Sequence, residues 1–436
     1  MTTATDFQQQ ALRLAAQQTS PAWLADLRAQ NADIWLQSAW PGRRTEDWKY
    51  TPLQALQTDG FTQWAQPSDG HEQAEWLALD AHRLVLVNGV FSEALSTALP
   101  SNLVRFDQAN ADQQSIITQH LGSVVDPQRH LFGALSNACV ADGWLYHLGP
   151  NCQADKPLYV VHLSTPAAQP ALAQQRLLVV LERHAKASVI EHYVSTAEQQ
   201  NGFVNSLTEL VVGENAHLHH YRLNLEEEHL LHVGGVHANL QRTAVLDAFA
   251  LGQGSRLKRV DYHIRHIGEG AHLALNGIYL PRNKQRIDYH THVEHCVPHC
   301  TTDENFRGII ADAAKAVFNG RIHIHKDAQK TLAELSNKNL LTSKTAEIDT
   351  KPELEIYADD VKCAHGATVS QLNETAMYYL QSRGVARAEA EVMLSFGFIN
   401  ELLQNVAEPA IQTYLRPRLA SLFGNDDELA RHLIHD

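Results

Sequence analysis

Histidine is the residue type in this sequence with the greatest capacity for chemistry. Twenty-six of the 436 residues are histidines, and thirteen of these lie between His217 and His299. Imidazole titrates near neutral pH and is the commonest metal ligand in proteins. Because strand residues two apart share a face, His217 and His219 form one imidazole row, and His290 and His292 form another. Such rows could bind a metal ion, although any single histidine is better explained as a polar strand position that faces solvent.

The run from His290 to Cys300 concentrates further ligand types for zinc or iron. It contains Cys296 and Cys300, four residues apart, but no second pair at the spacing of a closed zinc site. Glu294 follows His292 by only two residues, which does not match a His-x-His motif with a downstream glutamate. The run therefore favours a labile or partner-shared site over a closed structural one.

Cys363 and His365 form a second candidate metal site. On an extended strand both side chains project from one face, where a thiolate and an imidazole can share one soft metal ion. Two ligands leave a tetrahedral ion incomplete, so other residues of the chain or a second subunit must complete the site. The structural alternative is that Cys363 is a small buried residue and His365 a hydrogen-bonded polar one.

The composition excludes several classes of function. With 35 Lys+Arg and 49 Asp+Glu, the formal net charge is −14, which opposes binding to nucleic acid or to an anionic membrane. The sequence contains no phosphate-binding Gly-x-x-x-x-Gly-Lys-Ser/Thr loop and no Gly-x-Ser-x-Gly nucleophile motif. It shows no signal peptide and no apolar run of membrane-spanning length, so we expect a cytoplasmic protein. The five cysteines are odd in number and widely spread, which indicates reduced thiols.

Residues 1–150 are expected to form an N-terminal helical or α+β domain. Six of the seven tryptophans lie in the first 76 residues, and good helix formers predict helices over 7–18 and 21–39. The strand-like run 83–91 contains Asn88-Gly89, a pair that accepts the positive φ angles of a tight hairpin turn.

Residues 151–369 are expected to form a right-handed parallel β-helix, a solenoid of stacked coils. Short β-branched runs alternate with small turns, and similar turn-to-strand junctions recur at uneven spacing. A two-sheet sandwich or a jelly roll is the alternative fold. The similar junctions are 182–190, 213–219, 252–258, 268–274 and 326–332.

Residues 370–436 are expected to form a C-terminal helical domain. A helix over 371–383 ends at Gly384, a natural left-handed stop, and 387–406 is amphipathic. Its apolar stripe either caps the open end of the solenoid or docks a partner. The stripe residues assigned to partner docking are Val392, Phe396, Ile399 and Leu403.

Specific motifs resemble the SufB/SufD family of iron–sulfur cluster assembly proteins. The resemblance covers most of the chain, and the long run around Cys363 is its most specific part. The Cys-x-His-Gly-Ala-Thr ending and the large N-terminal domain are most similar to the SufD branch. Ala364 and Thr342 depart from residues common in the family. The similar segments are 44–51, 306–310, 316–320, 329–331, 337–341, 350–369 and 378–384.

The resemblance implies a scaffold subunit with no catalytic activity of its own. It implies pairing with SufB and binding of the SufC ATPase on the C-terminal helical domain, with iron or a nascent cluster formed at the SufB–SufD interface. In that assembly His365, with Cys363 beside it, would contribute to a site that a SufB cysteine completes. The resemblance also assigns the apolar stripe to docking of SufC or to support of the docking surface.

Several alternatives stay open at this stage. A stand-alone β-helix metalloenzyme with a histidine-rich site is the second functional hypothesis. The isolated chain is expected to need no cofactor, but a reduced flavin in the complex and a homodimer of the isolated chain both stay open. The run from His290 to Cys300 receives no role from the resemblance and is kept as a separate metal hypothesis.

Overall fold

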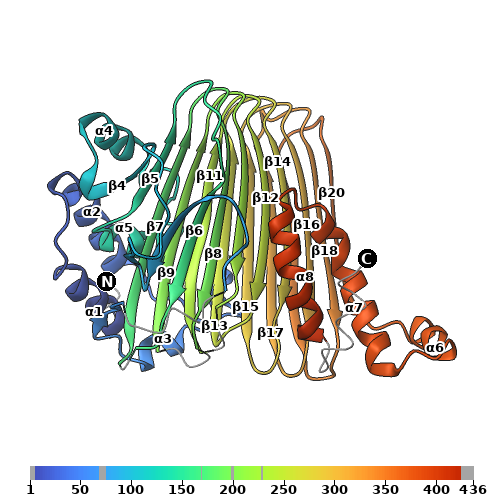
Figure 1. The fold of residues 1–436 in the computed structure, drawn as a ribbon. Coiled ribbons are helices and arrows are strands. Elements are labelled where there is room, and N and C mark those ends of the chain that lie inside the picture. The colour runs from blue at the N-terminus through green and yellow to red at the C-terminus, as the bar shows by residue number, and fades with distance from the viewer. Residues whose placement is uncertain (1–4, 68–74, 168, 198–200, 227–228, 424–436) are drawn as a thin grey trace.

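The computed structural model describes residues 5–67, 75–167, 169–197, 201–226 and 229–423 and consists of a parallel β-solenoid with helices on its outer faces (Figure 1). Consecutive long strands alternate between two ten-stranded sheets, here called sheet A and sheet B. Sheet A contains β1 (Gln63–Trp64), β4 (Leu103–Arg105), β5 (Trp144–Leu148), β7 (Ala171–Leu181), β9 (Gly202–Val212), β11 (Leu231–Leu240), β13 (Leu257–His266), β15 (Arg286–His295), β17 (Lys315–Ile324) and β19 (Glu347–Ile356). Sheet B contains β2 (His82–Val87), β3 (Val90–Phe91), β6 (Leu158–Ser164), β8 (Lys186–Ser195), β10 (His217–Asn224), β12 (Val245–Gln253), β14 (His272–Leu280), β16 (Thr301–Ile310), β18 (Leu332–Leu341) and β20 (Lys362–Gln371).

The long strands of each sheet pair in parallel with the strands of the neighbouring coils, which confirms the solenoid and rules out the antiparallel alternatives. Side chains alternate between the interior and the outer face of each sheet. The interior between the sheets is filled by a continuous apolar cluster that includes Leu218, Leu246 and Leu273 on successive strands of sheet B.

The turns from sheet A to sheet B explain four of the five similar junctions in the sequence; the junction 252–258 lies in a turn from sheet B to sheet A. Each A-to-B turn between β5 and β18 contains a residue with positive φ, and its backbone N–H donates to a carbonyl of the following turn, as from Asn215 to Arg242 (2.9 Å). The junctions are unevenly spaced because the returning turns differ in length, as in 254–256 and 281–285. The positive-φ residues of this turn ladder are Asn151, His184, Asn215, Thr243, Gly270, His299 and Lys330.

The N-terminal region covers part of the outer face of sheet A. The predicted hairpin is confirmed: Asn88 (φ 52°) and Gly89 (φ 86°) link β2 to β3. Trp35 and Phe132 pack with Phe203 on the sheet. Both predicted N-terminal helices are present, the second beginning with a 3-10 turn after Pro21. The helices are α1 (Asp6–Ala15), α2 (Ala25–Gln37), α3 (Gln54–Thr58), α4 (Ala111–His120) and α5 (Leu131–Cys139), with 3-10 turns at Ala22–Leu24, Glu46–Trp48 and Phe106–Gln108.

The C-terminal helices pack on the outer face of sheet B, where α7 and α8 lie over the strands and α6 projects away from the solenoid (Figure 1). The two predicted helices are present as α6 (Glu374–Ser382) and α7 (Arg387–Gln404), with Gly384 at φ 87° between them. The sequence prediction missed α8 (Pro409–Phe423). Because α7 contacts β14 and β16, its apolar stripe covers a face of the solenoid and not its open end. Across the described part of the chain, no helix is both long and apolar enough to cross a membrane.

A buried ion pair joins the N-terminal region to the solenoid. Glu209 on β9 and Arg176 on β7 are both fully buried and contact each other. Glu209 also accepts hydrogen bonds from the backbone N–H groups of Gly122 (2.8 Å) and Val124 (3.1 Å), and Arg176 donates to Asn137 (2.8 Å). The pair therefore fixes the loop before α5 against sheet A.

We predict that Glu209→Gln lowers the free energy of unfolding by about 3 kcal/mol, because it leaves the Arg176 guanidinium buried without a counter-charge. Urea unfolding followed by tryptophan fluorescence measures the loss. Glu214→Gln is the control, since Glu214 pairs with Arg242 in an exposed position where an ion pair contributes less than about 1 kcal/mol. Equal losses in the two variants would contradict the proposed anchoring role.

Candidate metal site at the open end of the solenoid

The two ends of the solenoid differ. At the N-terminal end, β3 and β4 pair antiparallel with β2 and β5 and finish both sheets. At the C-terminal end, β19 pairs only with β17 and β20 only with β18 among the described residues. Each of these last strands therefore has one free edge, with backbone N–H and C=O groups available for pairing.

Cys363 and His365 lie on β20, at this open end. In the parallel register they pair with Ala333 and Leu335 of β18, both of which belong to the interior core. Cys363 and His365 therefore share one face of β20, as the two-residue spacing predicts, and the register shows that this face points to the interior. Cys363 is half-buried and His365 is exposed, because no further coil covers the last one in the described structure.

Cys363 and His365 supply only part of the ligand set that a metal ion needs. Partial burial raises the pKa of the Cys363 thiol, so deprotonation needs a further favourable charge such as a bound cation. Among the described residues, neither Cys363 nor His365 belongs to a group of three or more potential metal ligands. The pair fits a soft metal ion or an iron–sulfur cluster only as part of a larger set of ligands.

Exposed apolar side chains surround the free edges. Ile356 and Tyr357 lie at the end of β19, and Val369 lies on β20; Tyr357 is 61% exposed. Long unpaired strands with exposed apolar side chains form the kind of surface on which another chain adds strands. The open end therefore combines two metal ligands with a surface suited to a protein partner.

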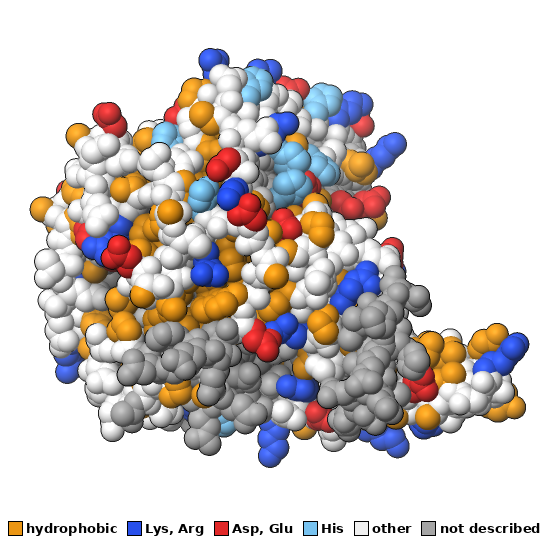
Figure 2. Space-filling model, in the orientation of Figure 1, with side chains coloured by type: hydrophobic (Ala, Val, Ile, Leu, Met, Phe, Trp, Pro, Cys, Tyr) orange, Lys and Arg blue, Asp and Glu red, His pale blue; other side chains and the backbone are white. Residues whose placement is uncertain are grey.

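The predicted docking stripe needs correction. All four of its residues are buried, Phe396, Ile399 and Leu403 of them against sheet B, and they do not form an exposed docking face. The sequence showed an apolar stripe but not which surface it covers. Exposed apolar residues of the helical region lie elsewhere, and Figure 2 shows hydrophobic side chains on the projecting tip where α6 lies. The buried stripe residues are Val392, Phe396, Ile399 and Leu403, and the exposed ones include Tyr378, Tyr379 and Met393.

The run from His290 to Cys300 does not form one site, because the strand divides its side chains between two faces. His292 and Glu294 lie on the outer face of sheet A, whereas His295 points to the interior and stacks on His266 at 4.3 Å between ring centroids. Cys300 is buried in the turn ladder, beside the alanines that hold the same place in neighbouring turns, and its thiol contacts the Gly268 carbonyl oxygen (3.4 Å).

Several histidines depart from the expectation of a polar strand position that faces solvent. Eight are buried. Of those in the interior, His220 lies 2.9 Å from Glu191, beside Arg222, and His232 contacts Glu226. His266 and His295 instead contact the Thr302 hydroxyl. Burial alone would raise the pKa of Glu191, but Arg222 and the neighbouring histidines hold it well below its ordinary value. Alternation alone could not show which of the two faces of a strand is buried. The buried histidines are His162, His192, His220, His232, His237, His263, His266 and His295.

Comparison with known proteins agrees with this architecture. A family model described as "SUF system FeS cluster assembly, SufBD core domain" matches residues 163–398, and one described as "SufBD protein N-terminal region" matches residues 4–160. The chain is 32% identical to the iron–sulfur cluster assembly protein SufD of Escherichia coli, over 88% of this chain and 89% of that protein. It is 30% identical to an iron–sulfur cluster assembly SufBD family protein of Synechocystis, over 91% of each chain.

The interior acid Glu304 yields a pH-dependent prediction. Burial raises its pKa to about 8 from an ordinary value of 4.5, and Thr291 donates a hydrogen bond to it. The folded chain thus holds a proton that the unfolded chain releases, so the stability this group contributes is complete below pH 4.5 and lost as the pH rises through 8.

We predict that Glu304→Gln, which keeps the size and removes the titration, gains stability relative to the unchanged chain as the pH rises. The difference in unfolding free energy between the two should change by roughly 4 to 5 kcal/mol from pH 4.5 to pH 9. Urea unfolding at a series of pH values measures it. A difference that stays constant with pH would show that Glu304 is ionised in the folded chain.

Proposed function

Because the chain belongs to the SufBD family of iron–sulfur cluster assembly proteins, we propose that it is a non-catalytic, cytoplasmic scaffold subunit that pairs with a SufB-like chain and binds a SufC-like ATPase. One observation carries the proposal: Cys363 and His365 lie on a strand whose outer edge is free. Their ligand set is incomplete among the described residues, and exposed apolar side chains surround them.

The partner's role follows from the open end. A SufB-like solenoid that adds its strands to β19 and β20 satisfies the free backbone groups and buries Ile356 and Val369. The same pairing encloses Cys363 and His365 between the two chains. A nascent cluster, the cargo of the complex, then takes a ligand from His365 and the remaining ligands from the partner, with Cys363 beside it.

The ATPase is assigned to the C-terminal helices. Their apolar stripe is buried on sheet B and holds α7 in place, which leaves the exposed Tyr378 and Tyr379 of the projecting α6 as the contact surface. Helices packed rigidly on the solenoid transmit a movement of the bound ATPase to the strands beneath them. Closure of two ATPase copies thereby strains the pairing of the two solenoids and opens the cluster site.

We predict that His365→Ala lowers the cluster content of the complex co-expressed with SufB-like and SufC-like partners, because one ligand is lost while the strand edge is kept. Iron and acid-labile sulfide per complex are the measurement. His147→Ala, which removes a half-buried histidine at the far end of sheet A, is the control and should leave the content unchanged. Full cluster content in His365→Ala would exclude a ligand role.

We also predict that the two docking surfaces can be separated. Val369→Lys places a charge beside the free edge of β20 and should reduce co-purification of the SufB-like chain, with little effect on the ATPase. Tyr379→Glu should do the reverse. Each variant is the control for the other, and both change exposed side chains, so the thermal unfolding of the isolated chain should be unchanged. Loss of both partners in either variant would contradict two separate surfaces.

A further inference from the structure

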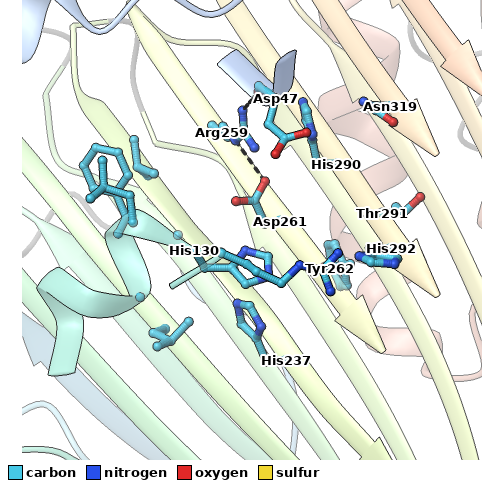
Figure 3. A pocket seen from close by; sticks show the side chains of 18 of the residues that line it. Asp47, His130, His237, Arg259, Asp261, Tyr262, His290, Thr291, His292 and Asn319 are labelled. Carbon is cyan, nitrogen blue, oxygen red and sulfur yellow. Dashed lines mark hydrogen bonds and ion pairs between the residues drawn. The ribbon is translucent and has the colours of Figure 1, made fainter. Parts of the chain in front are cut away.

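A cleft on the outer face of sheet A holds a second set of potential metal ligands, away from the open end. The parallel register places His237 of β11, His263 of β13 and His292 of β15 side by side in one column. The cleft is bordered by Asp47 and Trp48 of the 3-10 turn and by Leu131 and Phe132 at the start of α5. Figure 3 shows His130, the residue before α5, reaching over the column toward His237.

Three of these imidazoles converge. His130, His237 and His263 each offer one ligand nitrogen, and the three nitrogens lie within 4.8 Å of one another. The ring centroids of His130 and His237 are 4.6 Å apart, and those of His130 and His263 are 5.2 Å apart. Small rotations of the side chains would bring the three nitrogens to the roughly 2.1 Å that an ion requires.

The hydrogen bonding at this site is incomplete in a way that suits an ion. Each of the three histidines has a buried ring nitrogen without a hydrogen-bond partner in the described structure: Nε2 of His130 and Nδ1 of His237 and His263. His237 and His263 are 2% and 3% exposed. His130 stands at the N-terminus of α5 yet makes no capping hydrogen bond with its side chain. Buried polar atoms are normally paired, so these call for an explanation.

Glu294 orients one of the three. Its carboxylate lies 3.2 Å from Nε2 of His263, whose other ring nitrogen, Nδ1, is the one buried without a hydrogen-bond partner in the described structure. A carboxylate that holds one ring nitrogen while the other faces the ion is the usual arrangement around metal-ligating histidines. The arginines nearby are matched by acids: Arg129 contacts Glu294 (3.1 Å), and Arg259 contacts Asp261 (2.9 Å).

We propose that His130, His237 and His263 bind a divalent first-row transition-metal ion, such as Fe²⁺ or Zn²⁺, with one coordination position open to the cleft. Three imidazole ligands favour such ions over Mg²⁺ or Ca²⁺, which require oxygen ligands. Burial lowers the pKa of His130 to about 4, so protons do not compete with the ion near neutral pH. The site needs no partner chain and is separate from Cys363 and His365, so it goes beyond the proposed scaffold function.

Titration of the full chain, stripped of metal with a chelator, with Co²⁺ as a spectroscopic probe tests the proposal. We expect binding of one Co²⁺ ion per chain with ligand-field absorption, and displacement by Zn²⁺. His130→Ala and His237→Ala should each weaken binding at least about tenfold, and Glu294→Gln by about 10- to 100-fold through the loss of orientation. His130 and His237 belong to no other group of potential ligands in the described structure, so these variants report on this site alone.

The matched control is His323→Ala, which removes an imidazole from the same face of sheet A but belongs to no such group; its affinity should be unchanged. Because His130 lies outside the sheet, His130→Ala decides the result if His237→Ala unfolds. Absence of Co²⁺ binding, or equal affinity in His130→Ala and the unchanged chain, overturns the proposal. Binding that persists in a Cys363→Ser, His365→Ala background separates this site from the proposed cluster site.

Discussion

The rest of the structure depends on the parallel backbone pairing between successive coils. Each strand from β6 to β20 takes its place from the parallel strand one coil earlier, and the turn ladder repeats the same hydrogen bond from coil to coil. Residues one coil apart therefore become neighbours about 4.8 Å apart on the same face. This constraint creates the apolar interior, the histidine column of sheet A and the position of Cys363 and His365 on the last strand.

The same pairing explains which structural features could be predicted from the sequence alone and which could not. The hairpin at Asn88 and Gly89, the helix stop at Gly384 and the same-face geometry of Cys363 and His365 rest on contacts between residues close in sequence, and all were predicted. The histidine column was missed because its members are a coil apart and the coil lengths are uneven. An assigned coil register would have revealed His237, His263 and His292, but nothing in the sequence brings His130 to them.

The alternation of polar and apolar residues along a strand also did not determine which polar side chains are buried. A strand of alternating polar and apolar residues normally turns its polar side to water, and on that basis the histidines were expected outside. In this solenoid both faces of many strands are covered, by the opposite sheet within and by helices outside, so polar residues on either face become buried. Glu191 with Arg222, and Glu226 with Lys258, show how the interior accommodates them, with each acid beside a cation. The same covering explains why the apolar stripe of α7 is not exposed: it packs against the outer face of sheet B.

The turn ladder also restricts how this chain can change in length. Adding or removing one residue within a strand would displace every later side chain to the opposite face, and a change within a left-handed turn would break its hydrogen bond to the next coil. Changes in length are therefore accommodated in the turns that return from sheet B to sheet A, which already differ in length, or by a whole coil. The number of coils thus fixes the distance along the solenoid between the N-terminal helices and the open end.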